Sequence, residues 1–130
     1  IHACTDVTGF GLLGHCAEMA SASRAKICLH PQEIACIDGA KEYAQMGLVP
    51  GGAYRNRAHV ASLLDAGDTD EMYMDLLSDP QTSGGLLAAV PKEEAEALLE
   101  AFEKAGMETK VSVVGTVLDS EGEEAKIYIR

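Results

Sequence analysis

The sequence predicts an α+β domain in which a mixed β-sheet is covered by helices. Apolar residues recur at steps of three and four in residues 10–22 and 91–105, which is the spacing of amphipathic helices. Residues 86–90, 111–117 and 127–129 are short apolar or alternating runs, which are typical of strands. We expect these three strands to join one sheet and both helices to cover it. A chain of 130 residues is long enough for one domain with its own core.

The first half of the chain is predicted to be mainly helical. The helix at residues 10–22 follows a Thr-Asp-Val-Thr-Gly turn at residues 5–9, where small polar residues and glycine favour a helix start. Residues 26–29 form a short strand that ends at His30-Pro31. Further helices are predicted at residues 37–46, 56–66 and 72–77, with a loop at residues 49–52.

The second half is predicted to alternate strands with one long helix. Pro91 is placed where that helix can begin, Gly106 where it ends, and Leu98 and Phe102 lie on its apolar face. On its polar face, Glu100 and Lys104 have the i, i+4 spacing of an ion pair.

The order of the last elements predicts how they connect. Because a helix separates the strands at residues 86–90 and 111–117, we expect a right-handed crossover between them. Residues 119–124 turn the chain, and residues 126–130 run back as the final strand of a hairpin.

The charge balance excludes several classes of partner. Acidic residues outnumber basic ones, which gives a net charge of −11. Such a surface repels nucleic-acid phosphates and anionic lipid headgroups, so we expect no nucleic acid and no membrane partner. No apolar run approaches the roughly 18 residues of a membrane span, and no secretory signal follows Ile1, so we expect a soluble, cytoplasmic protein. Because the chain begins with Ile1 rather than Met, we also expect a piece of a longer chain.

The four cysteines have neither zinc-site spacing nor the distribution of a disulfide framework. They lie at residues 4, 16, 28 and 36, with no Cys-x-x-Cys pair. Two disulfides remain possible, but free and mostly buried thiols in a reducing compartment are the favoured interpretation.

Residues 5–11 are the first candidate site. Asp6 and Thr8 stand just before a predicted helix, and Gly9 allows a ligand to approach the backbone closely. A Mg²⁺ ion suits Asp6, and a phosphate suits the helix end, although a single carboxylate is an incomplete Mg²⁺ site. Spacing alone favours the alternative that Asp6 or Thr8 merely caps the helix.

Residues 79–85 and His15 are weaker candidates. The loop at 79–85 contains Thr82, Ser83 and paired glycines, but a strand follows it, so a tight turn with an Asx-type bond from Asp79 is favoured over a phosphate cradle. His15 and Cys16 are adjacent on a predicted helix and therefore point about 100° apart. A packed, hydrogen-bonded histidine is accordingly favoured over a Cys-His nucleophile pair.

Several segments resemble one known enzyme family. Residues 2–15, His-Ala-Cys-Thr-Asp-Val-Thr-Gly-Phe-Gly-Leu-Leu-Gly-His, closely resemble the start of the C-terminal domain of the selenophosphate synthetases, also called selenide, water dikinases. Residues 79–87, Asp-Pro-Gln-Thr-Ser-Gly-Gly-Leu-Leu, look like the second signature of that family. Residues 47–56 and 114–117 are similar to it as well, so the resemblance spans almost the whole chain in order.

The resemblance implies a fold, a reaction and a missing partner domain. The family has the aminoimidazole ribonucleotide synthetase fold and makes selenophosphate, AMP and orthophosphate from ATP, selenide and water. The resemblance implies that residues 1–130 are the single C-terminal domain of a two-domain homodimeric enzyme. In that family the N-terminal domain holds the nucleotide and supplies the reactive Cys or selenocysteine, which Cys4 is not. The fragment alone is therefore expected to be inactive, with no catalytic residue of its own.

The resemblance also implies site residues. Asp6, in Thr-Asp-Val-Thr-Gly-Phe-Gly, resembles the Mg²⁺ ligand of the family's C-terminal domain, which favours the metal interpretation over capping. By position, Thr8 and Gly9 would border the phosphates of the substrate ATP. The alternative is a catalytically silent binding or scaffold module of the same fold.

Overall fold

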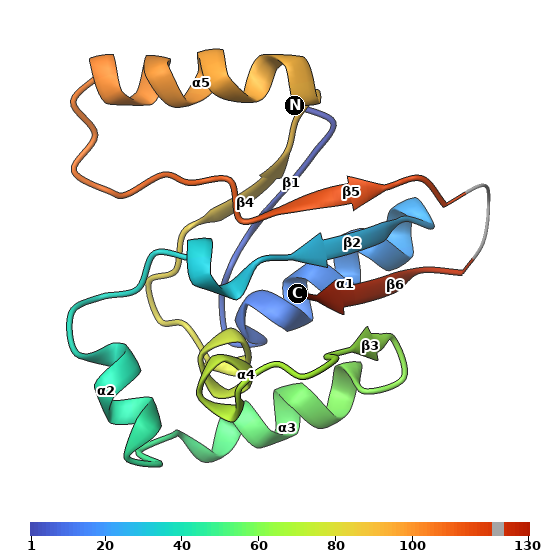
Figure 1. Cartoon of the computed structure of the whole chain (residues 1–130), viewed down its shortest axis with the longest axis vertical. Helices are drawn as coiled ribbons and strands as arrows, with labels where there is room; N and C mark the ends of the chain where they lie inside the picture. Colours follow the sequence, from blue (N-terminus) through green and yellow to red (C-terminus); the bar gives the residue numbers. More distant parts are fainter. Residues whose placement is uncertain (121–123) are drawn as a thin grey trace.

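The computed structural model describes residues 1–120 and 124–130. Within them the chain forms short strands and helices that alternate irregularly (Figure 1). In chain order the elements are β1 (Ala3–Asp6), α1 (Gly11–Ser23), β2 (Lys26–Leu29), the 3₁₀ turn η1 (Pro31–Glu33), α2 (Ala40–Gln45), α3 (Gly51–Val60), β3 (Leu64–Asp65), α4 (Glu71–Ser78), β4 (Leu86–Ala89), α5 (Lys92–Lys104), β5 (Gly115–Leu118) and β6 (Lys126–Ile129).

The main sheet is mixed, which confirms the predicted α+β class. Its four strands have the order β3-β6-β2-β5, in which β2 is parallel to β6 and antiparallel to β5. Strand β3 is parallel to β6 on the other side. Parallel neighbours require long connections, and here α3, α4 and the intervening segments supply them.

The predicted pairing of the late strands is wrong. Strand β4 lies in a separate two-stranded sheet, antiparallel to β1, with Asp6 opposite Leu86 and Ala3 opposite Ala89. The predicted right-handed crossover from β4 to β5 is therefore wrong, because these strands belong to different sheets. The predicted hairpin is also wrong, since β2 lies between β5 and β6. The turn proposed at residues 119–124 falls partly outside the described residues.

Several element boundaries also differ from the prediction: the strand expected at residues 111–117 spans Gly115–Leu118, and the helix expected at residues 37–46 spans Ala40–Gln45. The segment expected to be a turn at residues 5–9 begins as strand, because Thr5 and Asp6 pair with β4. The helix expected at residues 56–66 instead spans Gly51–Val60, beginning directly after Pro50, whose φ of −64° suits a helix start. It ends early because the backbone turns toward the sheet, where the amide of Ile127 donates to the carbonyl of Leu63 at 2.8 Å.

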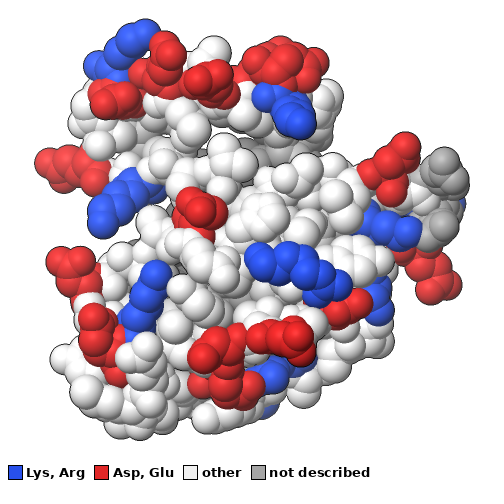
Figure 2. Space-filling view, in the orientation of Figure 1, with Lys and Arg blue, Asp and Glu red and all other residues white. Residues whose placement is uncertain are grey.

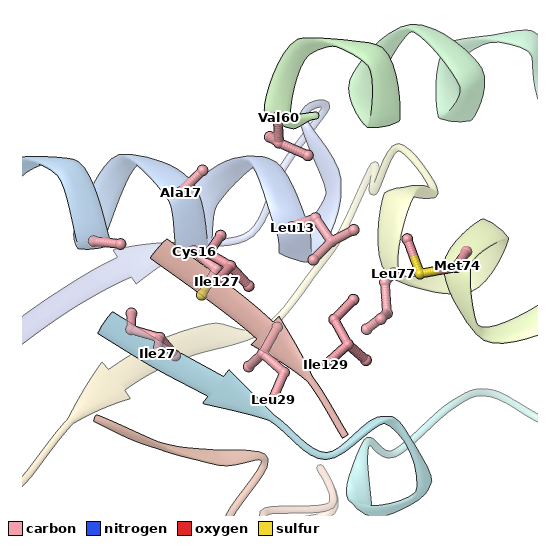
Figure 3. Close-up of a cluster of buried hydrophobic side chains, with 11 residues drawn as sticks. Leu13, Cys16, Ala17, Ile27, Leu29, Val60, Met74, Leu77, Ile127 and Ile129 are labelled. Carbon is pink, nitrogen blue, oxygen red and sulfur yellow. The ribbon is translucent and has the colours of Figure 1, made fainter. Parts of the chain in front are cut away.

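The hydrophobic core lies between helix α1 and the four-stranded sheet. Alternate residues of β2 and β6 are buried, as the period of two in a strand requires. Figure 3 shows their side chains facing α1, with α3 and α4 closing the core from the side. The labelled residues are Leu13, Cys16, Ala17, Ile27, Leu29, Val60, Met74, Leu77, Ile127 and Ile129.

Helix α5 is confirmed, but it does not cover the four-stranded sheet. It lies at the top of Figure 1, at the opposite end of the molecule from α2 and α3. Leu98 and Phe102 are half-buried, and no residue of this helix is fully buried. Its outer face carries many of the acidic groups in Figure 2, and Lys104 donates to Glu100 at 3.0 Å as predicted. None of the described helices is long and apolar enough to cross a membrane.

Two isoleucines test the assignment of the core. Ile127 is 0% exposed on β6, whereas Ile37 is 84% exposed before α2. We expect Ile127→Ala to lower the free energy of unfolding by about 2–5 kcal/mol, because it removes buried methyl groups and leaves a cavity. Ile37→Ala should change it by less than about 0.5 kcal/mol. Urea unfolding of both variants measures the difference, and equal losses would contradict this core.

Candidate functional site

The two sequence signatures lie side by side in the structure. The amide of Val7 donates to the carbonyl of Gly85 at 2.9 Å, and the amide of Gln81 donates to the carbonyl of Thr8 at 3.0 Å. These bonds extend the β1-β4 pairing into the loop at residues 79–85. The turn before α1 and the loop after α4, more than 70 residues apart in sequence, therefore form one unit.

Gly84 explains why one loop glycine is needed. A Cβ atom at this position would overlap the carbonyl oxygen of Val7. The backbone of the loop can approach β1 only because Gly84 has no side chain. Gly85, in contrast, has open space where its Cβ would be. Gly84 thus has a structural function that is independent of any phosphate.

Helix α3 joins this unit through a buried side chain. The Asn56 amide nitrogen donates to the carbonyl of Gly9 at 2.9 Å and to the carbonyl of Ser78 at 3.0 Å. One side chain thereby fixes the turn before α1, the end of α4 and the middle of α3. The start of α3 also lies close to the loop after α4, since a Cβ at Gly52 would lie 2.7 Å from Pro80 Cγ.

The three segments enclose an open pocket of about 410 Å³. Its walls come from the turn before α1, from the first turns of α3 and from the loop after α4. The lining residues are Thr8, Gly9, Phe10, Gly52, Arg55, Asn56 and Pro80. The structure therefore places Thr8 and Gly9, two of the predicted site residues, in the wall of one pocket.

Asp6 lies at the end of β1 with its side chain exposed. The capping interpretation is wrong for both Asp6 and Thr8, because Phe10 occupies the N-cap position of α1 and no side chain caps that helix. Within residues 1–120 and 124–130, no three His, Cys, Asp or Glu side chains are grouped so that they could hold a metal. Asp6 offers one carboxylate, so a metal here would take its other ligands from elsewhere.

His15 is a packed, hydrogen-bonded residue, as predicted. It is 7% exposed, and its Nε2 atom lies 3.0 Å from Thr8 Oγ1 while its Nδ1 atom lies 2.9 Å from Glu18 Oε2. A chain of hydrogen bonds therefore runs from Glu18 through His15 to the hydroxyl of Thr8 in the pocket wall. Burial raises the pKa of the neighbouring Cys16 thiol to about 12, so this cysteine is not a nucleophile. All four cysteines are free.

The prediction of an Asx-type bond from Asp79 is wrong. The carboxylate of Asp79 instead accepts from the side-chain amide of Gln81 at 2.8 Å, while the Gln81 backbone amide bonds to Thr8. Burial raises the pKa of Asp79, and the bond from Gln81 offsets part of that rise. The loop bends at residues 82–83, and backbone bonds to Val7 and Thr8, rather than a local Asx bond, hold it.

The fold and this pocket define the class of protein. Residues 1–128 match the family model described as "AIR synthase related protein, C-terminal domain". The chain belongs to this family of C-terminal domains.

Comparison with individual curated proteins gives a more specific similarity than the family model. The chain is 45% identical over 130 residues to a selenide, water dikinase of Caldanaerobacter subterraneus subsp. tengcongensis, covering 100% of this chain and 37% of that protein. It is 47% identical over 120 residues to one of Pelobacter propionicus, covering 92% of this chain and 34% of the relative. It is 41% identical over 119 residues to one of Clostridioides difficile, covering 91% and 34%. The resemblance to the selenophosphate synthetases is thereby confirmed, and the chain spans about a third of the length of these relatives.

Neighbouring glycines test the contact between the two signatures. We expect Gly84→Ala to lower the free energy of unfolding by about 1–3 kcal/mol, because the added methyl group overlaps the Val7 carbonyl and forces the loop away. Gly85→Ala, with open space around it, is the matched control and should be close to neutral. Thermal unfolding of both proteins provides the comparison, and equal stability of the two variants would contradict the contact.

Proposed function

We propose that this chain is the C-terminal part of an ATP-dependent selenophosphate synthetase, which makes selenophosphate, AMP and orthophosphate from ATP, selenide and water. One observation carries the proposal: the two segments that resemble the family's signatures meet at one pocket, in a chain similar throughout to selenide, water dikinases. An intact Asp6 and two intact signature loops favour an enzyme over a catalytically silent scaffold of the same fold.

Asp6 is the residue of this chain that would bind Mg²⁺. Its carboxylate is a hard oxygen ligand, is exposed at the end of β1 and accepts no hydrogen bond from the described residues. Mg²⁺ commonly takes one or two protein carboxylates and completes its shell with water and nucleotide phosphates, so a single Asp suits a shared site. The ion would neutralise negative charge on the phosphates.

Thr8 and Gly9 would border those phosphates. Both line the pocket, and the hydroxyl of Thr8 is oriented by the buried imidazole of His15. Thr8 has a single O–H, so it would donate to an oxyanion only when His15 Nε2 donates its hydrogen to Thr8 Oγ1. These residues bind and position the substrate, and the catalytic groups lie outside this chain.

The remaining functions belong to the rest of the protein in this proposal. Residues 1–130 are one C-terminal domain, and an N-terminal domain of the same polypeptide supplies the nucleotide pocket, the reactive Cys or selenocysteine and the dimer contact. The whole protein acts as a cytoplasmic homodimer.

Replacing Asp6 in the full-length protein tests the metal assignment. Asp6→Asn keeps the shape of the side chain but removes the charge that makes its oxygen a strong Mg²⁺ ligand. We expect a loss of selenophosphate formation of tenfold or more, which corresponds to about 1.4 kcal/mol or more in transition-state stabilisation. Rates are measured across a Mg²⁺ titration, with a thermal melt to verify folding.

The control is Asp68→Asn, which alters an exposed aspartate in the turn between β3 and α4. This variant should retain the wild-type rate at every Mg²⁺ concentration. Wild-type rates in Asp6→Asn would remove the metal function from Asp6 and leave this domain without an identified chemical role.

The second test concerns the 130-residue chain by itself. We expect it to form neither AMP nor selenophosphate from ATP and selenide, because one carboxylate and one open pocket do not assemble a complete nucleotide and metal site. The assay follows AMP by chromatography, with the full-length enzyme as the positive control. Selenide-dependent AMP formation by the isolated chain would overturn this part of the proposal.

A further inference from the structure

The pocket contains a cation that no carboxylate neutralises. Arg57 pairs with Glu71, and Arg130 pairs with Asp65 at 3.2 Å, but Arg55 forms no ion pair within the described residues. Among the residues that the structure describes, none that lines this pocket is acidic, although Asp and Glu make up 21 of the 130 residues of the chain. In a protein of net charge −11, an unpaired arginine in an acid-free pocket locally reverses the repulsion of anions.

Arg55 is exposed, and its guanidinium lies beside the pocket, near two glycines. The next residue, Asn56, fixes this turn of α3 through its bonds to the carbonyls of Gly9 and Ser78. The guanidinium lies near a glycine pair, since a Cβ at Gly52 would be 3.8 Å from Nη2 and one at Gly51 would be 4.0 Å from Nη1. A larger residue at either position would therefore take up space beside the charged group.

The opposite wall supplies a second polar group. Thr8 lines the pocket, and the position next to it, Gly9, has no atom of the described residues within 4 Å of where a Cβ would be. The planar guanidinium of Arg55 suits a tetrahedral oxyanion, because arginine can donate two parallel hydrogen bonds to two of its oxygens. A pocket of about 410 Å³ has room for a phosphoryl group and for part of the molecule that carries it.

We propose that Arg55 binds a phosphoryl group in this pocket, opposite Thr8. The inference rests on the proposed function for the identity of the ligand, because a phosphoryl-transfer reaction brings such groups to this surface. Two sources have the same chemistry: the phosphate chain of the nucleotide and the free orthophosphate released by the reaction. Arg55 is a binding residue in this assignment and takes no part in bond breaking.

Anion binding by the full-length protein tests the assignment without any turnover. Isothermal titration calorimetry at one fixed Mg²⁺ concentration gives the Kd for inorganic tripolyphosphate and, separately, for orthophosphate. We expect Arg55→Ala to raise at least one Kd tenfold or more, because it removes the charge and the paired donors together. Arg55→Lys should raise the Kd by a smaller factor, since lysine keeps the charge but lacks the paired N–H donors of arginine. Arg55→Gln is a second neutral variant if Arg55→Ala does not fold.

The control and the outcomes separate the alternatives. Arg24→Ala removes an exposed arginine at the end of α1, outside the pocket, and should leave both Kd values unchanged. A change confined to tripolyphosphate assigns the pocket to the nucleotide chain, and a change confined to orthophosphate assigns it to the free product. Wild-type Kd values in folded Arg55→Ala or Arg55→Gln, or no binding by the wild-type protein, would overturn the proposal.

This measurement also separates the inference from the proposed function. If the full-length protein makes no selenophosphate but Arg55→Ala still weakens anion binding, the pocket assignment stands and the reaction assignment fails. If selenophosphate forms and Asp6→Asn abolishes it, but Arg55→Ala binds both anions normally, only the Arg55 assignment fails.

Discussion

The site depends on the side chain of Asn56. A carboxamide has two N–H donors on one nitrogen, and here they satisfy the backbone carbonyls of Gly9 and Ser78. Those carbonyls belong to segments that share no regular secondary structure with each other or with α3. Ser78 is buried, so without Asn56 its carbonyl would lose a partner that water cannot replace, at a cost of about 1–3 kcal/mol. One polar side chain thus ties α3 to the two segments that the backbone bonds of Val7 and Gln81 already join.

The sequence was most informative where the structure is local. Helix α1, helix α5 and strand β2 are predicted well because their residues have the period of the element or its clear end signals. Pairing between strands is not local, and four-residue strands such as β4 and β5 are equally compatible with several partners. Strand β2 lies between β5 and β6 because Ile27 and Leu29 join the side chains of Ile127 and Ile129 beneath α1, a match visible only after folding. Strand β3, with two residues, has no period to detect.

The same distinction applies to the site. Asp6, Thr8 and Gly9 stand together in one short segment, and its resemblance to a family signature, rather than its spacing, marks them as site residues. Arg55 and Asn56 occur in a helix with little apolar periodicity, Asn56 lies 47 residues from Gly9, and only tertiary contacts bring them to the pocket. Capping of α1 by Asp6 or Thr8 was a reasonable expectation for a polar residue before a helix. It fails because Asp6 is drawn into β1 and Thr8 is engaged by His15.

The separation of the β1-β4 pair from the main sheet gives this molecule two levels of cooperativity. No residue of β1 or β4 is fully buried, whereas β2 and β6 each bury two residues in the core. A two-stranded ribbon is marginal on its own, so its opening costs less free energy than global unfolding. Because the pocket-lining turn at residues 8–10 continues directly from β1, an anion bound there would favour the closed ribbon by mass action. Occupancy and local order at this end of the molecule are therefore thermodynamically linked, while the core beneath α1 remains folded in either state.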